Sequence, residues 1–206
     1  MRNNEISGFV NGIYFKHSNS LDNTGPIIEN NYIHGCKVPM LLACNQGYIK
    51  NNLIAGNILS GWDGGIGDGG CGSDYNTYEH NTVTGYLEFE SHCGASDRGA
   101  TNNNLWGNII AMRSIFNGGG SVPLNMNSDY NLFPPGIVIV DYRTQYDLAG
   151  WSSANGSDSH SKSGTPAFAG GEPEVDGFLL LPGSPGKGVA SDGTDMGADV
   201  SLVGVR

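Results

Sequence analysis

The chain has 206 residues, 38% hydrophobic and 15% charged, so it can bury one full core and is typical of a single folded domain. Its formal net charge of −10 opposes binding to nucleic acid or to an anionic membrane, because both depend on cationic patches. No apolar stretch approaches the roughly 20 residues of a membrane span, and the first residues lack the apolar core of a signal peptide.

Five segments share one pattern, in which an asparagine is followed two residues later by isoleucine or valine. They are residues 3–8, 30–35, 51–56, 80–85 and 107–111. Their second positions are 27, 21, 29 and 27 residues apart, and a period in this range indicates a solenoid of stacked coils. The aliphatic residue should face inward. We expect the asparagines to take left-handed backbone at coil corners and to form a hydrogen-bonded ladder, with Asn31, Asn52 and Asn81 on one axis.

Residues 62–74 pack six glycines and three aspartates into thirteen positions. They fit the opening of a calcium-binding nonapeptide repeat, but Asn76 occupies its apolar position and no second copy is present. The surrounding interval is the longest of the repeat, so we expect a loop that leaves the coil. A calcium site formed by Asp63, Asp68 and Asp74 is the alternative, since Ca²⁺ takes six to eight oxygen ligands.

Each corner is followed by a segment typical of a strand, within residues 12–17, 40–44, 63–68 and 86–92. Side chains alternate between the two faces of a strand, which predicts an outward column of small residues between two charges. That column is Lys16, Ala43, Gly67 and Glu90. Coils stack about 4.8 Å apart, so Lys16 and Glu90 should lie about 14 Å apart.

This outward face has the composition of a sugar-binding groove. Aromatic rings at Tyr14, Trp62 and Tyr86 would stack on sugar rings, while Asp68 and Glu88 would bind hydroxyls or a cation. The simpler alternative is that the charges are merely solvated.

The cysteines are Cys36, Cys44, Cys71 and Cys93, which lack the spacing of a zinc site. Buried thiols are the favoured interpretation. A Cys71–Cys93 disulfide is the alternative, because these two lie about one repeat apart.

The asparagine corners resemble those of right-handed parallel β-helix proteins of the pectate-lyase-like superfamily. Segments resembling the closing part of such proteins follow at residues 127–133, 148–151, 165–168, 178–185 and 195–198. The resemblance implies an all-β, right-handed parallel β-helix of about five coils in residues 1–135, closed by residues 136–206 of the same domain. It also implies an extracellular or cell-surface location. The departure at residues 186–188, where a small apolar run is usual, leaves the packing there open.

An open solenoid end exposes apolar side chains and strand edges. The C-terminal residues can supply a cap, but only two residues precede the first corner. We therefore expect either a longer β-helix or a homo-oligomer that covers the open N-terminal coil.

The resemblance implies a polysaccharide ligand and two possible reactions. A lyase would use calcium to acidify a uronate proton, with Lys16 or Arg98 as the base and His17 as a proton carrier. A hydrolase would use Glu88 and Glu90, one outward step or about 6.5–7 Å apart, with Asp68 nearby. No catalytic motif of a named family is matched. The rival hypothesis is a non-enzymatic structural or adhesion module of a larger fibre protein.

Overall fold

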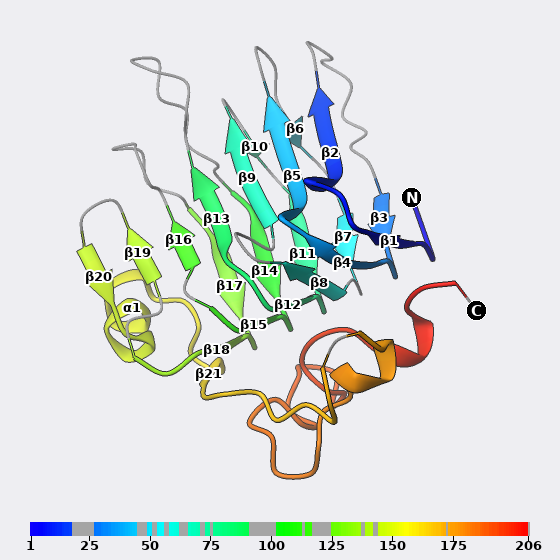
Figure 1. Cartoon of the computed structure of the whole chain (residues 1–206). Helices are drawn as coiled ribbons and strands as arrows, with labels where there is room; N and C mark the ends of the chain where they lie inside the picture. Colours follow the sequence, from blue (N-terminus) through cyan, green and yellow to red (C-terminus); the bar gives the residue numbers. More distant parts are fainter. Residues whose placement is uncertain are drawn as a thin grey trace.

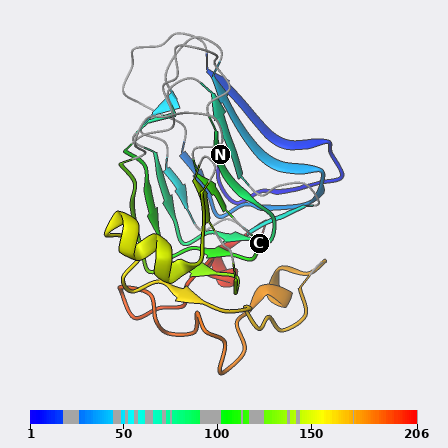
Figure 2. The same cartoon turned by 90° about the vertical axis from the view of Figure 1, so that its left-hand side faces the viewer.

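The computed structural model describes residues 1–17, 27–44, 49–50, 53–55, 58–61, 66–70, 73–74, 76–90, 102–112, 114–116, 125–136, 139–141, 144–171 and 173–205. Over these residues the protein is mostly β, a parallel β-solenoid of about three turns with one short helix. Figure 1 shows the strands stacked in layers, with the C-terminal segment running beneath them. In Figure 2, turned so that the α1 end faces the viewer, the sheets surround one interior.

Three mainly parallel sheets form the solenoid. The back sheet contains, in order, β17 (Asn127–Asp129), β14 (Asn104–Trp106), β11 (Thr77–Glu79), β7 (Leu53–Ala55) and β3 (Ile27–Glu29). The flank sheet contains β1 (Glu5–Ser7), β4 (Tyr32–Cys36), β8 (Ile58–Gly61), β12 (Thr82–Val83), β15 (Ile109–Ile110), β18 (Leu132–Phe133) and β21 (Lys162–Ser163). The wall sheet contains β2 (Asn11–His17), β5 (Val38–Cys44), β9 (Ile66–Gly70), β13 (Leu87–Glu90), β16 (Ser114–Phe116), β19 (Ile139–Asp141) and β20 (Thr144–Tyr146).

One turn consists of a back strand, a flank strand and a wall strand. The runs β3–β4–β5, β11–β12–β13 and β14–β15–β16 follow this order. Neighbouring strands pair in parallel throughout, except for the antiparallel pair β19–β20. A small separate sheet pairs β6 (Ile49–Lys50) with β10 (Ser73–Asp74).

The interior is an apolar stack drawn from all three sheets. Flank strands contribute Ile33, Val83 and Ile110, which are at most 1% exposed, as alternation between the two strand faces predicts. The predicted aliphatic column is confirmed at these three positions, and Ile6 in the first strand is half-buried. Wall and back strands add Met40, Leu87, Phe89, Tyr78 and Leu105 to the same core.

Asparagines at the corner before the flank strands form a hydrogen-bonded ladder. The Nδ2 amide of Asn81 donates to Oδ1 of Asn108 at 3.0 Å, and Nδ2 of Asn108 donates to Oδ1 of Asn131 at 3.0 Å. Asn4 donates in the same way to Asn31 at 2.9 Å. Asn31, Asn81, Asn108 and Asn131 are at most 1% exposed, so each amide satisfies backbone groups that water does not reach.

The third corner differs from the prediction. Ile58 pairs with Tyr32 and with Thr82, so the flank strand of this coil begins at Ile58 and not just after Asn52. Leu53 pairs instead with Ile27 and Thr77, which places the residues after Asn52 in the back sheet. With Asn57 in the series 4, 31, 57, 81, 108 and 131, the spacings become 27, 26, 24, 27 and 23 residues. Asn57 itself lies outside the described residues.

The left-handed backbone also lies one residue earlier than predicted. The φ angles of Asn3, Asn30, His80 and Tyr130 lie between 48° and 57°, and Gly107 has a φ of 67°. Each of these precedes a ladder asparagine. Each corner therefore uses two consecutive residues. The first adopts the left-handed backbone, and the asparagine that follows supplies the side-chain amide of the ladder.

The glycine-rich stretch is not a loop over its described part. Residues Ile66–Gly70 form β9, which is paired on one side with β5 and on the other with β13. The expected surplus of residues also disappears, because the flank strand next to β4 is β8, which begins at Ile58. These glycines are compatible with a strand because β5 and β13 pair with the backbone of β9 on its two sides.

Residues 144–158 close the far end of the solenoid. Helix α1 (Leu148–Asn155) begins at Asp147, whose side chain accepts from the Gly150 amide, and ends at Gly156 with a left-handed φ of 66°. Trp151 is 3% exposed and joins the central core. Strands β19 and β21 continue the wall and flank sheets past residue 135.

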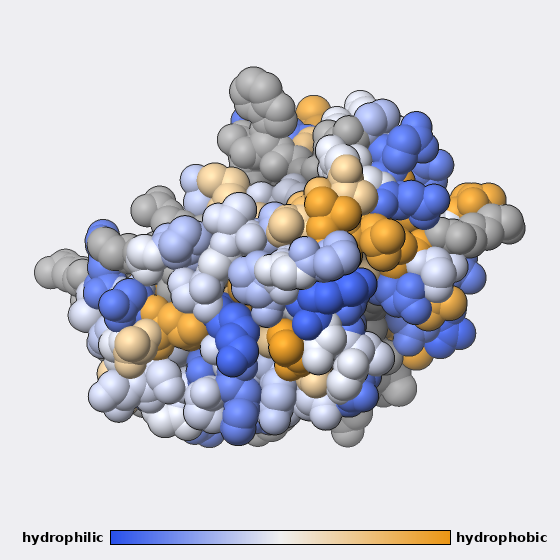
Figure 3. All heavy atoms as spheres, turned by 90° about the horizontal axis from the view of Figure 1, so that it is seen from below, coloured by the Kyte–Doolittle hydropathy of each residue, from blue (hydrophilic) through white to orange (hydrophobic). Residues whose placement is uncertain are grey.

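The remaining C-terminal residues run back along the outside of the flank sheet. They include η2 (Val175–Phe178) and η3 (Val200–Leu202). Phe178 and Val203 pack on Tyr32 and Ile58, while Leu180, Ala190 and Met196 pack on Ile109 and Leu132. Figure 3 shows the outer surface of this region, where apolar side chains lie among polar ones.

Two other predictions concern single features. Cys36 is a buried free thiol, as predicted for the cysteines, whereas Cys71 and Cys93 lie outside the described residues. Within the part of the chain that the structure describes, no helix is long and apolar enough to span a membrane.

Candidate functional site

Among the described side chains predicted for the site, Tyr14 and Glu88 lie on the outer face of the wall sheet. Ile13 and Leu87 are buried, whereas Tyr14 is 51% exposed and Glu88 is half-buried, so even-numbered positions of β2 and β13 face outward. Tyr14 pairs with Leu41, Leu41 with Gly67, and Gly67 with Glu88. We call these four residues the first outer column.

A second outer column lies one step further along each strand. Lys16 pairs with Ala43, Ala43 with Gly69, and Gly69 with Glu90. Lys16 and Glu90 are therefore three strands apart in one column, as predicted. The residue between Ala43 and Glu90 is Gly69, however, and the predicted Gly67 belongs to the first outer column. The register differs from the predicted one by two residues, because Ile66 pairs with Met40, which is buried.

Asp68 lies in the wall sheet, where its backbone pairs with Leu42 and with Phe89. Its neighbours Gly67 and Gly69 pair with Glu88 and Glu90. The side chain of Asp68 lies outside the described part of the structure, so its role beside this pair stays a prediction.

The other predicted site residues are distributed as follows. His17 ends β2 opposite Cys44, and Tyr86, just before β13, is half-buried. Asp74 lies in β10 opposite Lys50, away from the wall sheet. Trp62, Asp63 and Arg98 lie outside the described residues.

The predicted calcium ligands do not meet in one described loop. Asp68 is in the wall sheet and Asp74 is in the small sheet. The backbone of Ile66–Gly70 pairs with strands on both sides, so its carbonyls do not form the oxygen cage of a glycine-rich calcium loop. Among the described side chains, no three His, Cys, Asp or Glu residues cluster as metal ligands do. A calcium site with Asp63 remains a prediction.

The outer face of the wall sheet has a low strip of glycine residues between taller side chains. Gly67 and Gly69 lie next to each other across the middle of the strip and bring the backbone to the surface. Tyr14 stands two strands away on one side and Glu88 one strand away on the other. The described side chains that flank this floor are an aromatic ring, which can stack on a flat apolar face, and a carboxylate, which can accept hydrogen bonds.

Asp129, Tyr130 and His160 form a polar cluster at the corner that precedes the flank sheet, and it was not predicted from the sequence. The Asp129 carboxylate accepts from the His160 backbone at 2.7 Å and lies 2.7 Å from His160 Nδ1, while the His160 ring stacks on Tyr130 at 4.7 Å. Burial raises the pKa of Asp129, but the hydrogen bonds from His160 and from the Tyr130 backbone outweigh it and lower the pKa below 3.8. Only the corner repeat, with Tyr130 in the place of His80, could have indicated this cluster.

No protein-family model, no curated protein and no solved structure matches this chain. The geometry of the wall sheet is therefore the basis for the functional proposal.

Proposed function

We propose that this protein binds a polysaccharide along the outer columns of its wall sheet. The observation that carries the proposal is the register, which lines up Tyr14, Leu41, Gly67 and Glu88 although they are scattered over 75 residues of sequence. A linear polymer suits this surface because the columns extend along the stack, and three strand spacings of about 4.8 Å match two or three sugar rings.

The proposal includes a right-handed parallel β-helix of about five coils, of the pectate-lyase-like kind. Parallel crossover connections are right-handed in about 98% of cases, which supports this handedness. The series of corner asparagines at 4, 31, 57, 81, 108 and 131 supports the number of coils.

If turnover accompanies binding, the Glu88–Glu90 pair is the stronger candidate for the chemistry. Both carboxylates belong to outward positions of β13, and two residues along a strand span about 6.5–7 Å. That separation lies within the range of inverting glycosidases, which leave room for a water molecule. A lyase would instead use Lys16, at the other end of the second outer column, or Arg98.

Binding is tested on a panel of neutral and uronate polysaccharides, with and without calcium, by retardation in gels that contain each polymer. Turnover is followed in parallel by release of reducing ends and by the ultraviolet absorbance of unsaturated uronates. Tyr14→Ala should weaken binding of the retained polymer by about tenfold, since one sugar-stacking ring contributes roughly 1–1.5 kcal/mol. The matched control is Tyr130→Ala, an aromatic substitution on the corner line, which should leave binding unchanged.

The proposal fails if no polymer on the panel retards the wild-type protein, or if Tyr14→Ala and Glu88→Gln both bind like wild type. Lys16→Ala and Glu90→Ala separate the two reactions. Loss of reducing-end release in Glu90→Ala alone supports a hydrolase, whereas loss of unsaturated product in Lys16→Ala supports a lyase.

A second candidate, a structural or adhesion module, is favoured by the exposed first coil. Strands β1, β2 and β3 each lie at the edge of their sheet. Phe9, Val10 and Ile27 are 60%, 70% and 43% exposed there. Unpaired edges and apolar side chains of this kind are covered in stable solenoids, which supports a second copy of the chain at this end. Sedimentation velocity tests it, because Val10→Lys should convert an oligomer to a monomer.

A further inference from the structure

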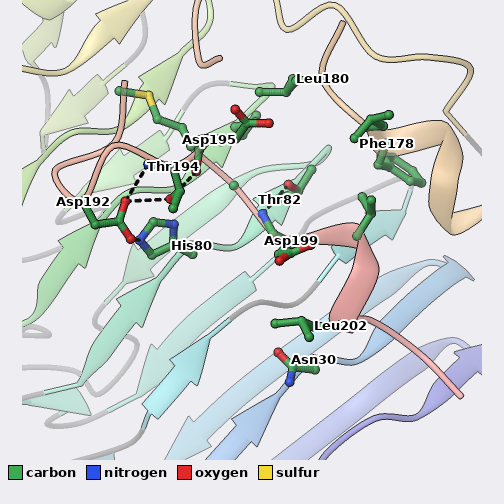
Figure 4. A pocket seen from close by; sticks show the side chains of 16 residues that line it. Asn30, His80, Thr82, Phe178, Leu180, Asp192, Thr194, Asp195, Asp199 and Leu202 are labelled. Carbon is green, nitrogen blue, oxygen red and sulfur yellow. Dashed lines mark hydrogen bonds and ion pairs between the residues drawn. The ribbon is translucent and has the colours of Figure 1, made fainter. Parts of the chain in front are cut away.

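A cavity of about 470 Å³ lies between the C-terminal segment and the flank sheet, on a different sheet from the wall (Figure 4). Its floor comes from the solenoid, through Thr82 of β12 and Ile109 of β15. Its sides come from residues 178–180 and 192–202 of the C-terminal segment. The volume falls within the range of small-molecule sites, which is about 300–1,000 Å³.

The inner part of the cavity is apolar and firmly built. Ile109, Phe178, Leu180 and Met196 line it and are at most 4% exposed. The segment is pinned to the solenoid by backbone bonds, since the Gly197 amide donates to the Gly107 carbonyl at 2.7 Å and the Ala198 amide donates to Thr82 Oγ1 at 3.0 Å. The walls therefore have a fixed shape before any ligand arrives.

The rim of the cavity is acidic. Asp192, Asp195 and Asp199 line it, and among the described residues no lysine or arginine does. The Asp195 carboxylate is neutralised from outside the lining, because Lys187 Nζ donates to it at 2.8 Å. Asp192 and Asp199 accept mainly from uncharged donors, Thr194 and the Ser201 amide. Figure 4 shows Asp199 beside Thr82, and Asp192 next to Thr194 and His80.

The hydrogen bonds and the neighbouring histidine of Asp192 favour its charged form. Hydrogen bonds from the Thr194 hydroxyl and backbone amide, helped by nearby His80, lower the pKa of Asp192 below 3.8. His80 Nε2 lies 3.9 Å from Asp192 Oδ2, too far for a strong hydrogen bond. The rim therefore holds negative charge that no described lysine or arginine of the lining offsets.

We propose that this cavity binds a small organic amine, with its apolar body against Phe178, Leu180 and Met196 and its ammonium group at the acidic rim that Asp192 and Asp199 line. An ammonium supplies three hydrogen-bond donors and one positive charge, which complements two carboxylates at the mouth of an apolar pocket. A carboxylate ligand of the same shape would meet like charge at the rim.

Three probes with one apolar body and different charges test this assignment. They are 2-phenylethylamine, 2-phenylethanol and 3-phenylpropanoate, each titrated into the 206-residue protein by calorimetry at neutral pH. The amine should bind at least about fivefold more tightly than the alcohol, and the propanoate should bind more weakly than either.

Matched variants separate the charge from the apolar walls. The double variant Asp192→Asn with Asp199→Asn keeps the oxygen acceptors for Thr194 and the Ser201 amide, so it should fold, and its preference for the amine should fall below about twofold. Glu174→Gln removes the charge of an exposed carboxylate that does not line the cavity, and its amine preference should stay. Leu202→Ala, at a lining residue that is 56% exposed, should weaken the amine and the alcohol alike.

Three results would overturn the proposal. One is equal or tighter binding of the alcohol or the propanoate to the wild-type protein. Another is an unchanged amine preference in the double variant, confirmed as folded by circular dichroism. The third is the absence of heat from all three probes at millimolar concentration.

Discussion

At the scale of single residues, the buried asparagine ladder stabilises the fold through hydrogen bonds between neighbouring coils. Asn108 donates through Nδ2 to the carbonyls of Tyr78 and Trp106 and to Asn131, and its Oδ1 accepts from the Asn81 backbone and side chain. Most of these groups are buried, so loss of the amide removes several hydrogen bonds that water does not replace.

Asn108→Ala should therefore lower the free energy of unfolding by roughly 2–4 kcal/mol. Asn127 is the matched control, because its Nδ2 also donates to an asparagine one coil away, at 3.0 Å, but at an exposed position. Asn127→Ala should cost less than about 1 kcal/mol. Urea denaturation measures both, and equal losses would show that the ladder's burial is unimportant.

Gly197 tests the close contact between the C-terminal segment and the solenoid. A Cβ atom there would come within 2.5 Å of Thr82 Oγ1 and 2.7 Å of Ile109, and the φ angle is 85°. Gly193 has a similar φ of 80° but nothing within 4 Å. Gly193→Ala should cost about 1 kcal/mol from backbone strain alone, and Gly197→Ala should cost about 1–3 kcal/mol more. Matching denaturation midpoints for the two variants would contradict the close contact.

The corner asparagines also show what could not be predicted from the sequence alone. Asn51 and Asn52 repeat the local corner pattern well, yet the strand that follows them lies in the back sheet, as does the strand after Asn76, while the flank strand of this coil begins at Ile58. Asparagine precedes back strands β11 and β14 as well as flank strands, so a single-sequence pattern cannot assign a copy to one corner or the other. Only strand pairing separates them.

At the scale of elements, the closing segment ends the ladder with a buried carboxylate. Asp158 accepts from Trp151 Nε1 at 3.0 Å, from Ser161 Oγ at 2.6 Å and from Ser128 Oγ at 2.9 Å. Burial raises the pKa of Asp158 above 3.8, although these hydrogen bonds oppose the shift. Helix α1 is thus tied to the last coil through a group that resists ionisation.

This raised pKa predicts a pH dependence with a defined sign. The folded protein binds the proton more tightly than the unfolded chain, so the contribution of Asp158 to stability falls as pH rises from 3.8 through the raised native pKa. Asp158→Asn should lower the free energy of unfolding by the same amount at every pH, because an amide replaces the carboxylate that accepts from Trp151. The pH dependence that Asp158 contributes should be absent from this variant. Unfolding free energies measured from pH 3.5 to 7 should therefore converge for the two proteins as pH rises, and parallel curves would contradict the assignment.

Strand β9 lies where the sequence patterns predicted both a strand around Ile66 and a loop that leaves the coil. Glycine is disfavoured in strands, so the five residues from Ile66 to Gly70, three of them glycine, indicate a loop when they are judged alone. Parallel pairing with β5 and β13 overrides that preference. The strands β2, β5 and β13, with ordinary alternation, were predicted correctly.

At the scale of the whole molecule, the C-terminal segment joins distant coils by running along the flank sheet. Phe178 contacts Tyr32 edge-on at a centroid distance of 6.0 Å and Phe168 at 5.5 Å, and the Gly204 amide donates to Asn30 at 2.9 Å. Sequence patterns indicated a closing segment but not this path, because the path depends on the outward residues of the flank strands.

Phe178→Ala should lower the free energy of unfolding by about 3 kcal/mol, since it empties a buried aromatic site. Amide hydrogen exchange should accelerate at Gly197 and Gly204 more than at Asn81 in the ladder. Leu181→Ala is the control, because Leu181 is 42% exposed in the same segment and should change stability by less than about 0.5 kcal/mol. Uniform acceleration over the whole chain would show that the segment does not open separately.

The central claim is that distant residues form one outer wall in a definite register, and backbone nuclear Overhauser effects between wall strands test it most directly. We predict contacts of Gly67 with Leu41 and Glu88, and of Gly69 with Ala43 and Glu90. Contacts of Gly67 with Ala43 and Glu90 instead would mean a register shifted by two residues. Such a result would remove the glycine floor between Tyr14 and Glu88 and contradict the proposed binding surface.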